Sequence, residues 1–563
     1  LYDPSGSFQN INRRYDIVYG DVMLNFNYNI RRFDIAATLG WTGRYENMNN
    51  MRVSTNGGLV TENWFDLNAS RYTASSTLQR MELLKTGYMG TLSLGWDNYL
   101  FLELTGRQER SSTLKDQSFF YPSANLSFLF SNAFRMPAWW NHGKLRLSYG
   151  IVGNAPETYA ANIIYEQGSD NGFTWNYVPS SWGNANIRPE KKYEYEIGLE
   201  SKFFNNRLGF DVSYYNNRVK DQILSTPQPS SSGVKYVLMN VGEVANEGWD
   251  ISVSATPILT KDFRWDLTAN YGIYRNKVVK LAEGVPYLEI SNIGGGGAKI
   301  QAVEGRPMGD IYVQVPQVNE NGDYLVSDKG LYLNQTDLQR VGNINPDGVG
   351  GLFSSFSYKN IFLDFSIDFR IGGDVINEMY QYSTASGLTP ESLQYRDTEH
   401  GGLSYYYPGN NNASGVPVQV DPSLGAGPNG EVIYHDGVIL PGVVASTGEK
   451  NTRIIPAGYY YNQTYNWGTQ PEQYTYRHSV FDNTYVKLRE LTIGYQFPEK
   501  LISKLGMTRL SVSVFGRNLF YFYKALKNYD AESSVGTSWA SQAVVGGSTT
   551  ATRNFGISLR ASF

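Results

Sequence analysis

The chain has 563 residues, of which 14% are aromatic, 18% are charged and none is cysteine. This composition excludes a disordered chain, which is poor in aromatic residues, and a coiled coil, which is dominated by Ala, Glu, Lys and Leu. The net charge of −4 and the lack of any run of Lys or Arg argue against nucleic acid as a partner. Without cysteine, disulfide scaffolds, Cys-ligated zinc and thiol catalysis are excluded as well.

A membrane-spanning helix is not expected either, because it would need roughly 18 consecutive apolar residues. The longest apolar run, residues 438–445, is broken by Pro441 and Gly442. The chain also opens without Met, a basic region or an apolar signal-peptide core. We therefore expect that a leader has been removed or that the sequence is a fragment.

The dominant pattern is an alternation of apolar and polar residues with period two, which is typical of β-strands. It begins at residues 21–30 and resumes at residues 33–41, and only Arg31 and Arg32 lie between the two runs. That spacing predicts a tight hairpin. The same alternation predicts further strands at residues 88–96, 193–199, 208–214, 249–255, 263–273, 361–371 and 555–563.

The length and composition of these strands favour a membrane barrel. They run for roughly 9–12 residues, whereas strands of globular proteins average about 5–6 residues and those that cross a bilayer need about 9–11. We expect an all-β fold, an antiparallel β-barrel of the outer membrane with some 14 to 16 strands here. The soluble alternative is a large multi-sheet protein such as a propeller, but the chain shows no blade-sized repeat.

Loop lengths predict the orientation of the barrel. Short turns are expected at residues 31–32, 205–206 and 359–360, and long loops at residues 42–80, 153–190, 278–340 and 374–480. Outer-membrane barrels have short periplasmic turns and longer extracellular loops, so the long segments are assigned to the cell exterior. Loops of this length usually carry function.

Enzyme motifs are missing from the sequence. The four histidines, His142, His400, His435 and His478, show no metal-binding spacing, and no nucleophile elbow or phosphate-binding loop occurs. No cofactor and no catalytic residue are therefore expected. Asn319, Asn321 and Asp323 resemble the start of a calcium loop, but a plain glycine-containing turn is the favoured interpretation.

Two further groups of side chains are candidate site residues. The first is polar and is expected to line the lumen, where Glu and Asp would meet Arg or Lys across the barrel: Glu194, Glu196, Glu200, Asp364, Asp368 and Arg370. The second consists of loop aromatics, whose rings could pack on sugars or peptide side chains: Trp175, Trp182, Tyr406, Tyr460 and Trp467. The alternative for the aromatics is packing between loops or an interfacial girdle.

Several segments resemble the SusC-like, or RagA-like, branch of TonB-dependent outer-membrane transporters of Bacteroidetes. They are residues 145–154 (LRLSYGIVGN), 186–190 (NIRPE), 240–249 (NVGEVANEGW), 305–309 (GRPMG), 345–348 (NPDG), 485–498 (YVKLRELTIGYQFP) and 515–520 (FGRNLF). Tyr529-Asp-Ala-Glu532 stands where the family usually has Asp-Pro-Glu. The terminal Phe563 resembles the sorting signal that the barrel-assembly machinery reads.

The resemblance implies how the protein is organised. Family members carry a signal peptide, a TonB box and a plug domain before a barrel of about 22 strands. None of these appears before the first strand here, so residues 1–563 are expected to form the C-terminal two-thirds of such a barrel. An open sheet edge is not tolerated in lipid, so the remaining strands are expected from a preceding segment.

The resemblance also implies the activity. We expect active import of a nutrient, an oligosaccharide first and an oligopeptide second, across the outer membrane of a Gram-negative bacterium. A SusD-like lipoprotein would act as a lid, TonB would supply energy through the plug, and two such pairs could form a dimer. The alternatives are a passive porin and, with less support, an outer-membrane enzyme.

Overall fold

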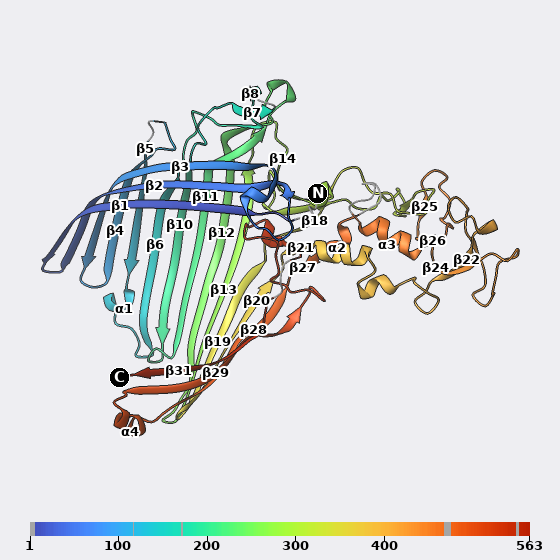
Figure 1. Cartoon of the computed structure of the whole chain (residues 1–563). Coiled ribbons are helices and arrows are strands. Elements are labelled where there is room, and N and C mark those ends of the chain that lie inside the picture. The colour runs from blue at the N-terminus through green and yellow to red at the C-terminus, as the bar shows by residue number, and fades with distance from the viewer. Residues whose placement is uncertain (1–5, 116–117, 171–172, 467–474, 548–550) are drawn as a thin grey trace. The chain divides into compact units, whose positions relative to one another are not determined.

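The computed structural model describes residues 6–115, 118–170, 173–466, 475–547 and 551–563. They divide into two compact units (Figure 1). Unit 1 consists of residues 1–247 and 279–285, and unit 2 of residues 248–278 and 286–563. No helix within these described ranges is long and apolar enough to cross a membrane.

Unit 1 is built on antiparallel strands that follow one another in the order β1-β2-β3-β4-β5-β6-β10-β11-β12. Their bounds are β1 Gln9–Ile30, β2 Phe33–Leu59, β3 Ser70–Trp96, β4 Leu100–Ser111, β5 Ser118–Phe128, β6 Trp140–Asn154, β10 Glu190–Phe203, β11 Leu208–Pro227 and β12 Tyr236–Leu259. The short helix α1 (Phe130–Ala133) follows β5. The loop after β6 carries the hairpin β7 (Glu166–Asp170) and β8 (Phe173–Tyr177), and then β9 (Ser181–Trp182).

Unit 2 continues with the second half of β12 and the order β13-β19-β20-β28-β29-β31. These strands are β13 Phe263–Lys280, β19 Gly348–Tyr358, β20 Ile361–Ile371, β28 Tyr485–Gln496, β29 Arg509–Lys524 and β31 Asn554–Ser562. Fifteen strands thus follow one another in the described part of the chain, within the predicted range. Every strand that the alternation predicts is present, and so are the short turns at residues 31–32 and 359–360 and the turn around Asn205.

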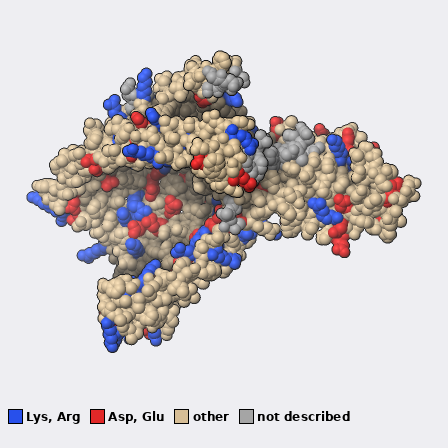
Figure 2. All heavy atoms as spheres, viewed as in Figure 1, with Lys and Arg blue, Asp and Glu red and all other residues tan. Residues whose placement is uncertain are grey.

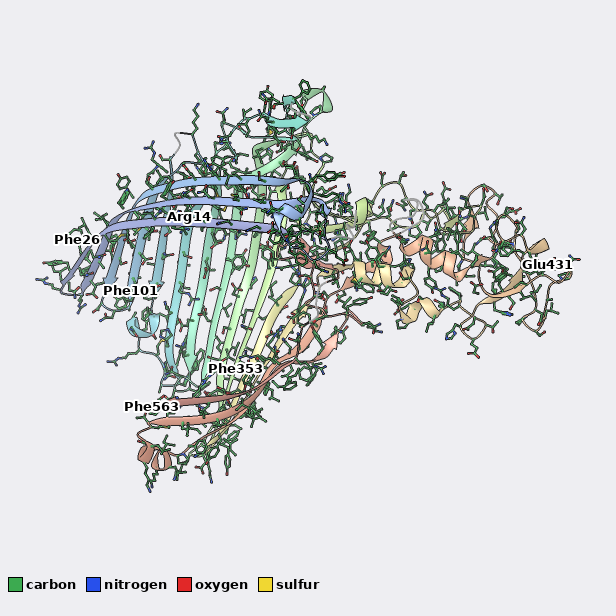
Figure 3. The ribbon with its side chains drawn as sticks, in the orientation of Figure 1. Arg14, Phe26, Phe101, Phe353, Glu431 and Phe563 are labelled. Carbon is green, nitrogen blue, oxygen red and sulfur yellow. The ribbon has the colours of Figure 1, made fainter. Side chains whose placement is uncertain are left out.

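The sheet of unit 1 has two unlike faces, which we call the apolar face and the polar face. On β1, Val22, Leu24 and Phe26 of the apolar face are each more than half exposed, and Figure 3 labels Phe26. On β10, Tyr195, Ile197 and Leu199 are about half exposed, whereas Glu194, Glu196 and Glu200 on the opposite face are more covered. A water-soluble protein would bury the apolar face, so this arrangement is typical of a barrel wall in lipid.

The strands differ from prediction mainly in length. β1 has 22 residues and β2 and β3 have 27 each, and 27 residues span roughly 90 Å at the usual rise per residue. The expectation of a long loop at residues 42–80 is therefore wrong, because β2 runs to Leu59 and β3 starts at Ser70. The segment lacks clean alternation since polar residues occupy both faces, but main-chain pairing of β2 with β3 continues as far as Leu59 and Ser70.

The loops of unit 2 carry small elements of their own. Residues 286–343 form the four-stranded sheet β14-β15-β16-β18 (β14 Tyr287–Ile293, β15 Ala298–Val303, β16 Asp310–Val313, β18 Gln339–Asn343). The segment 374–482 carries two helices, α2 (Glu378–Ala385) and α3 (Ala457–Tyr465). Its strands are β21 Asp374–Asn377, β22 Leu403–Tyr406, β23 Val418–Gln419, β24 Ile433–Val438, β25 Val443–Val444, β26 Ile455–Pro456 and β27 Val480–Asp482. β25 pairs in parallel with β17. β17 itself is Leu325–Val326, α4 is Glu499–Ile502 and β30 is Val544–Val545.

The largest hydrophobic core of unit 2 lies in these loops rather than against the wall of strands. Ile300 and Ile311 of the small sheet, Ile376 of β21, Tyr476 and Val544 of β30 are nearly or completely buried together. β21 pairs with both β27 and β30, so segments more than 150 residues apart in sequence form one three-stranded sheet. The core therefore fixes the long loops to one another.

Candidate functional site

The polar face of unit 1 carries ion pairs that connect neighbouring strands. Arg146 of β6 donates to Asp211 of β11 at 2.5 Å and to Ser213 at 3.1 Å, reaching across β10. Glu200 of β10 lies 3.3 Å from the Lys202 ammonium and 3.7 Å from both Arg146 and His142. Glu200 thus meets basic side chains of its own strand and of β6, and a network of this kind suits a wet, protein-lined surface rather than lipid.

The other predicted glutamates of β10 share this face. Glu194 accepts a hydrogen bond from Asn217 of β11 at 3.1 Å and lies 2.5 Å from the Lys192 ammonium. Glu196 pairs in register with Ser148 of β6 and Tyr215 of β11. Period two places all three glutamates together, as the sequence predicts.

A hollow of about 790 Å³ with a mixed apolar and polar lining, Phe101 among it, lies on the same face, near the end where the strands reverse in short turns. Asn27, Asn29, Asp34, Glu103 and Asn125 contribute to its lining. Amides and carboxylates here offer hydrogen bonds to a polar segment or to a ligand.

The polar residues predicted on β20 have separate partners in unit 2. Asp364 accepts a hydrogen bond from Ser355 of β19 at 2.6 Å. Asp368 binds the Arg489 guanidinium of β28. Arg370 donates instead to main-chain carbonyls, those of Ile344 at 3.0 Å and Gly372 at 3.2 Å. Arg370 therefore binds the main chain where loops join β19 and β20, whereas the two aspartates connect neighbouring strands.

An ionic cluster that sequence reasoning missed joins β28 to the segment after β29. Arg489 donates to both oxygens of Glu532, at 2.5 and 3.0 Å, in addition to Asp368. Lys487, whose side chain is 2% exposed, also pairs with Glu532. Both basic residues and Glu532 belong to motifs that carry the family resemblance, so the signal was present but their contact across 43 residues was not visible.

The candidate ligand-binding aromatics lie on separate elements. In unit 1, Trp175 is about half exposed on the hairpin strand β8, and Trp182 on β9 pairs in parallel with Val237 of β12. The Trp182 indole Nε1 is buried and finds no hydrogen-bond partner among the described residues. Trp467 lies outside the described residues.

In unit 2, Tyr406 and Tyr460 take part in loop packing. Tyr406 lies on β22, where it pairs with Val418 and Ile433. Tyr460 of α3 packs against two buried clusters, one around Leu331 and one around Tyr461 and Tyr465. Burial raises the pKa of Tyr460 above its ordinary value and that of Tyr461 to about 12. The Tyr460 ring thus belongs to a packed tyrosine cluster, and packing between loops is the alternative that the sequence left open for the aromatics.

The candidate calcium loop forms a closed turn. The Asn319 Oδ1 accepts hydrogen bonds from the main-chain N–H groups of Asn321, at 3.0 Å, and Asp323, at 2.9 Å. Its side-chain oxygen is therefore occupied in stabilising the turn. Within the described ranges, no group of three or more His, Asp or Glu side chains is arranged to hold a metal ion.

Comparison with known proteins identifies the family. Residues 1–316 match the family described as TonB dependent receptor-like, beta-barrel. The chain is 24% identical over 483 residues to TonB-dependent receptor P3 of Formosa agariphila, which covers 80% of the chain and 42% of that protein. It is 27% identical over 247 residues to TonB-dependent receptor SusC of Bacteroides thetaiotaomicron, which covers 40% of the chain and 24% of SusC.

A solved structure shares the fold. The RagAB peptide transporter superposes with a TM-score of 0.70 at 18% identity, covering 98% of this chain and 56% of the solved one. The chain spans less than half the length of the curated relatives P3 and SusC. Both relatives are named receptors, in line with the expectation that the chain is not an enzyme. With more than half of its residues matched, the chain belongs to the TonB-dependent receptor β-barrel family.

Proposed function

We propose that this chain forms barrel wall and loops of an active nutrient importer in the outer membrane of a Gram-negative bacterium. The observation that carries the proposal is the unlike pair of faces on one sheet. Exposed Val, Leu, Phe and Tyr suit lipid on the apolar face, and the ion-paired polar face suits a wet or protein-filled lumen. Membership of a receptor family whose barrels lie in the outer membrane supports the same assignment.

In this proposal a SusD-like lipoprotein covers the extracellular loops as a lid, and TonB acts through a plug domain. Two such pairs can associate as a dimer. The lid would meet the long loops, which carry the tyrosine cluster and the exposed Trp175. Phe563, 82% exposed after β31 and labelled in Figure 3, would serve as the sorting signal.

The cargo is proposed to be an oligosaccharide, with an oligopeptide as the second candidate. Loop aromatics such as Trp175 can stack on the apolar faces of sugar rings. The same rings can pack on peptide side chains, and the neighbour of similar fold is named a peptide transporter. The importer itself is expected to perform no chemistry on either cargo.

Uptake by living cells tests the proposal. A strain that lacks the gene would be compared with its complemented parent for accumulation of a labelled oligosaccharide and a labelled oligopeptide, with and without a protonophore. Uptake that needs both the gene and the proton-motive force supports active import. Gene-dependent uptake that the protonophore leaves unchanged would favour the passive porin.

Native mass spectrometry of the complex extracted from outer membranes tests the partners. A longer polypeptide or a plug-bearing piece, together with a lipoprotein of SusD size, is the expected result. A bare chain or a bare trimer would contradict the TonB mechanism.

A further inference from the structure

Aromatic rings form a continuous band at the end of unit 1 where the chain reverses in short turns. The band starts at Phe33 of β2, which stacks on Trp96 of β3 with ring centroids 6.3 Å apart. Trp96 contacts Tyr99 at 5.3 Å, and Tyr99 contacts Phe128 of β5 at 6.2 Å. Rings of β2, β3 and β5 are thus joined through Tyr99 of the β3–β4 turn.

The band continues along the turn between β5 and β6. Phe128 contacts Phe134 at 6.0 Å, and Phe130 meets Trp140 of β6 at 5.5 Å. Trp139 stacks on Phe204 at 6.2 Å in the turn that leads into β11. The Trp139 carbonyl accepts a hydrogen bond from the Phe204 main-chain N–H at 2.7 Å, which locks the two turns together.

Gly143 places this turn against the apolar face. Gly143 is paired with Ser201, and its neighbours Leu145 and Leu147 pair with Leu199 and Ile197 of the apolar face. A Cβ at Gly143 would lie only 2.1 Å from the Phe130 ring, so the ring lies directly on the strand where the side chain is missing. The turn, with α1 inside it, therefore folds back over the apolar face.

The outer side of the band is uncovered. Phe134 is 62% exposed, Phe204 54%, and Phe33 and Trp139 50% each. Leaving several large rings in water costs about 25 cal/mol for each Å² of apolar surface, which a barrel avoids by placing them at the level of lipid headgroups. The band is continuous with the exposed apolar face, which is the surface that faces lipid in this family's fold.

Arginine is the basic residue in the turns that edge the band. Arg31 and Arg32 form the β1–β2 turn, Arg135 lies in the β5–β6 turn and Arg207 precedes β11, and all four are exposed. The acidic residue of these turns is Asp97, which pairs with Arg32 at 3.6 Å. Lys144 and Lys202 nearby belong to β6 and β10, where they take part in the polar face with Glu200. Figure 2 shows Lys and Arg atoms at several points along the outline of the molecule in this view.

We propose that this band and its turn arginines form a binding surface for anionic phospholipids of the adjoining leaflet. The rings would lie beside the glycerol and upper acyl carbons, and the planar guanidinium groups would pair with the phosphates of the headgroups. The occupant is a lipid rather than a protein because the rings follow one edge across the turns of four hairpins and the arginines lie in three of those turns. This surface is independent of the cargo and of the lid.

Lipid retention tests the proposal. The complete receptor, extracted from membranes, would be exchanged into mixed micelles with phosphatidylglycerol or phosphatidylethanolamine, and bound lipids counted by native mass spectrometry. Arg135→Gln is expected to lower retained phosphatidylglycerol by about fivefold, since one basic residue near an anionic surface contributes on that scale. Arg71→Gln is the matched control, because Arg71 is an exposed arginine near the opposite end of β3.

Three outcomes would overturn the proposal. One is equal retention of phosphatidylglycerol by the wild type and by the Arg31→Gln/Arg135→Gln double variant. Another is displacement of the bound lipid by inorganic phosphate alone, which would point to an anion site without a lipid. The third comes from brominated phospholipid, which should quench the tryptophan fluorescence of the wild type more than that of Trp139→Phe. Equal quenching in the two proteins would show that the band does not lie in the bilayer.

Discussion

Arg489 of β28 and Glu532 lie face to face, with two hydrogen bonds of 2.5 and 3.0 Å between the guanidinium and the carboxylate. The second basic partner of Glu532 is Lys487, which is almost completely buried. Glu532 precedes the segment that carries β30, and β30 pairs with β21 at the base of the loop segment 374–482. The ionic cluster therefore ties long loops of unit 2 to the barrel wall.

Glu532→Gln should loosen this connection. The amide keeps the size of the side chain but leaves Lys487 and one side of Arg489 without their carboxylate, which costs about 2–4 kcal/mol in a largely buried setting. We expect a lower denaturation midpoint and faster hydrogen exchange in residues 525–547. Glu499→Gln on α4, an exposed glutamate, is the control and should change neither. Unaltered exchange in the Glu532 variant would show that the cluster does not hold the loop.

Gly143→Val should impair folding of the barrel. The Phe130 ring occupies the space that the new side chain needs, and overpacking of this kind costs about 1–3 kcal/mol. The folded fraction after refolding into detergent micelles measures the effect. Gly20→Val is the matched control, because a Cβ at Gly20 meets no atom within 4 Å. Equal yields from both variants would mean that Phe130 moves away at little cost.

The Tyr461 hydroxyl should ionise at a higher pH than that of an exposed tyrosine. Tyr461 is 3% exposed, its hydroxyl donates to the Glu391 carbonyl at 2.8 Å, and burial raises its pKa to about 12. Because the folded pKa lies above the ordinary value of 10.0, the stabilisation is complete below pH 10 and falls as the pH rises toward about 12. Ultraviolet difference absorbance of the wild type against Tyr461→Phe isolates this titration. A difference titration centred near pH 10 would show that the ring is accessible to water.

Trp182→Phe should weaken cargo binding while the barrel stays folded. The indole Nε1 is a buried donor without a partner in the described part of the chain, so the substitution breaks no hydrogen bond within the fold. If cargo accepts this hydrogen bond, affinity falls by about fivefold, which titration calorimetry would detect. Trp64→Phe, an exposed tryptophan after β2, is the control. Unchanged affinity would remove Trp182 from the cavity, and the same test applies to Trp467.

The alternation of side chains was sufficient to predict the wall of strands. Once Arg31 and Arg32 form the turn, Ile30 must pair with Phe33, and each residue of β1 then has a determined partner on β2. Such pairing is local, so a period of two residues together with the position of a turn decides both register and face. Glu194, Glu196 and Glu200 share one face for the same reason.

The ends of β2 and β3 that lie far from the short turns could not be predicted in this way. Residues 44–58 carry polar side chains on both faces, so no alternation marks them as strand. What holds them is main-chain pairing with strands on both sides, which every residue type can provide. Hydrophobic periodicity reports burial of one face, and it is silent where neither face is apolar.

By itself, the sequence predicted a range of 14 to 16 strands, their two faces and the resemblance to the family, because alternation and motifs depend on residues close together in the chain. Tertiary structure alone decided that Arg489 meets Glu532, that Tyr460 packs within a tyrosine cluster, and that Phe130 lies on Gly143. The first two contacts join segments that only the folding of the long loops brings together, and the third depends on how the β5–β6 turn folds back on β6. The free energy of these contacts depends on how side chains from different segments fit together in space. A repeating pattern along the sequence does not encode that fit.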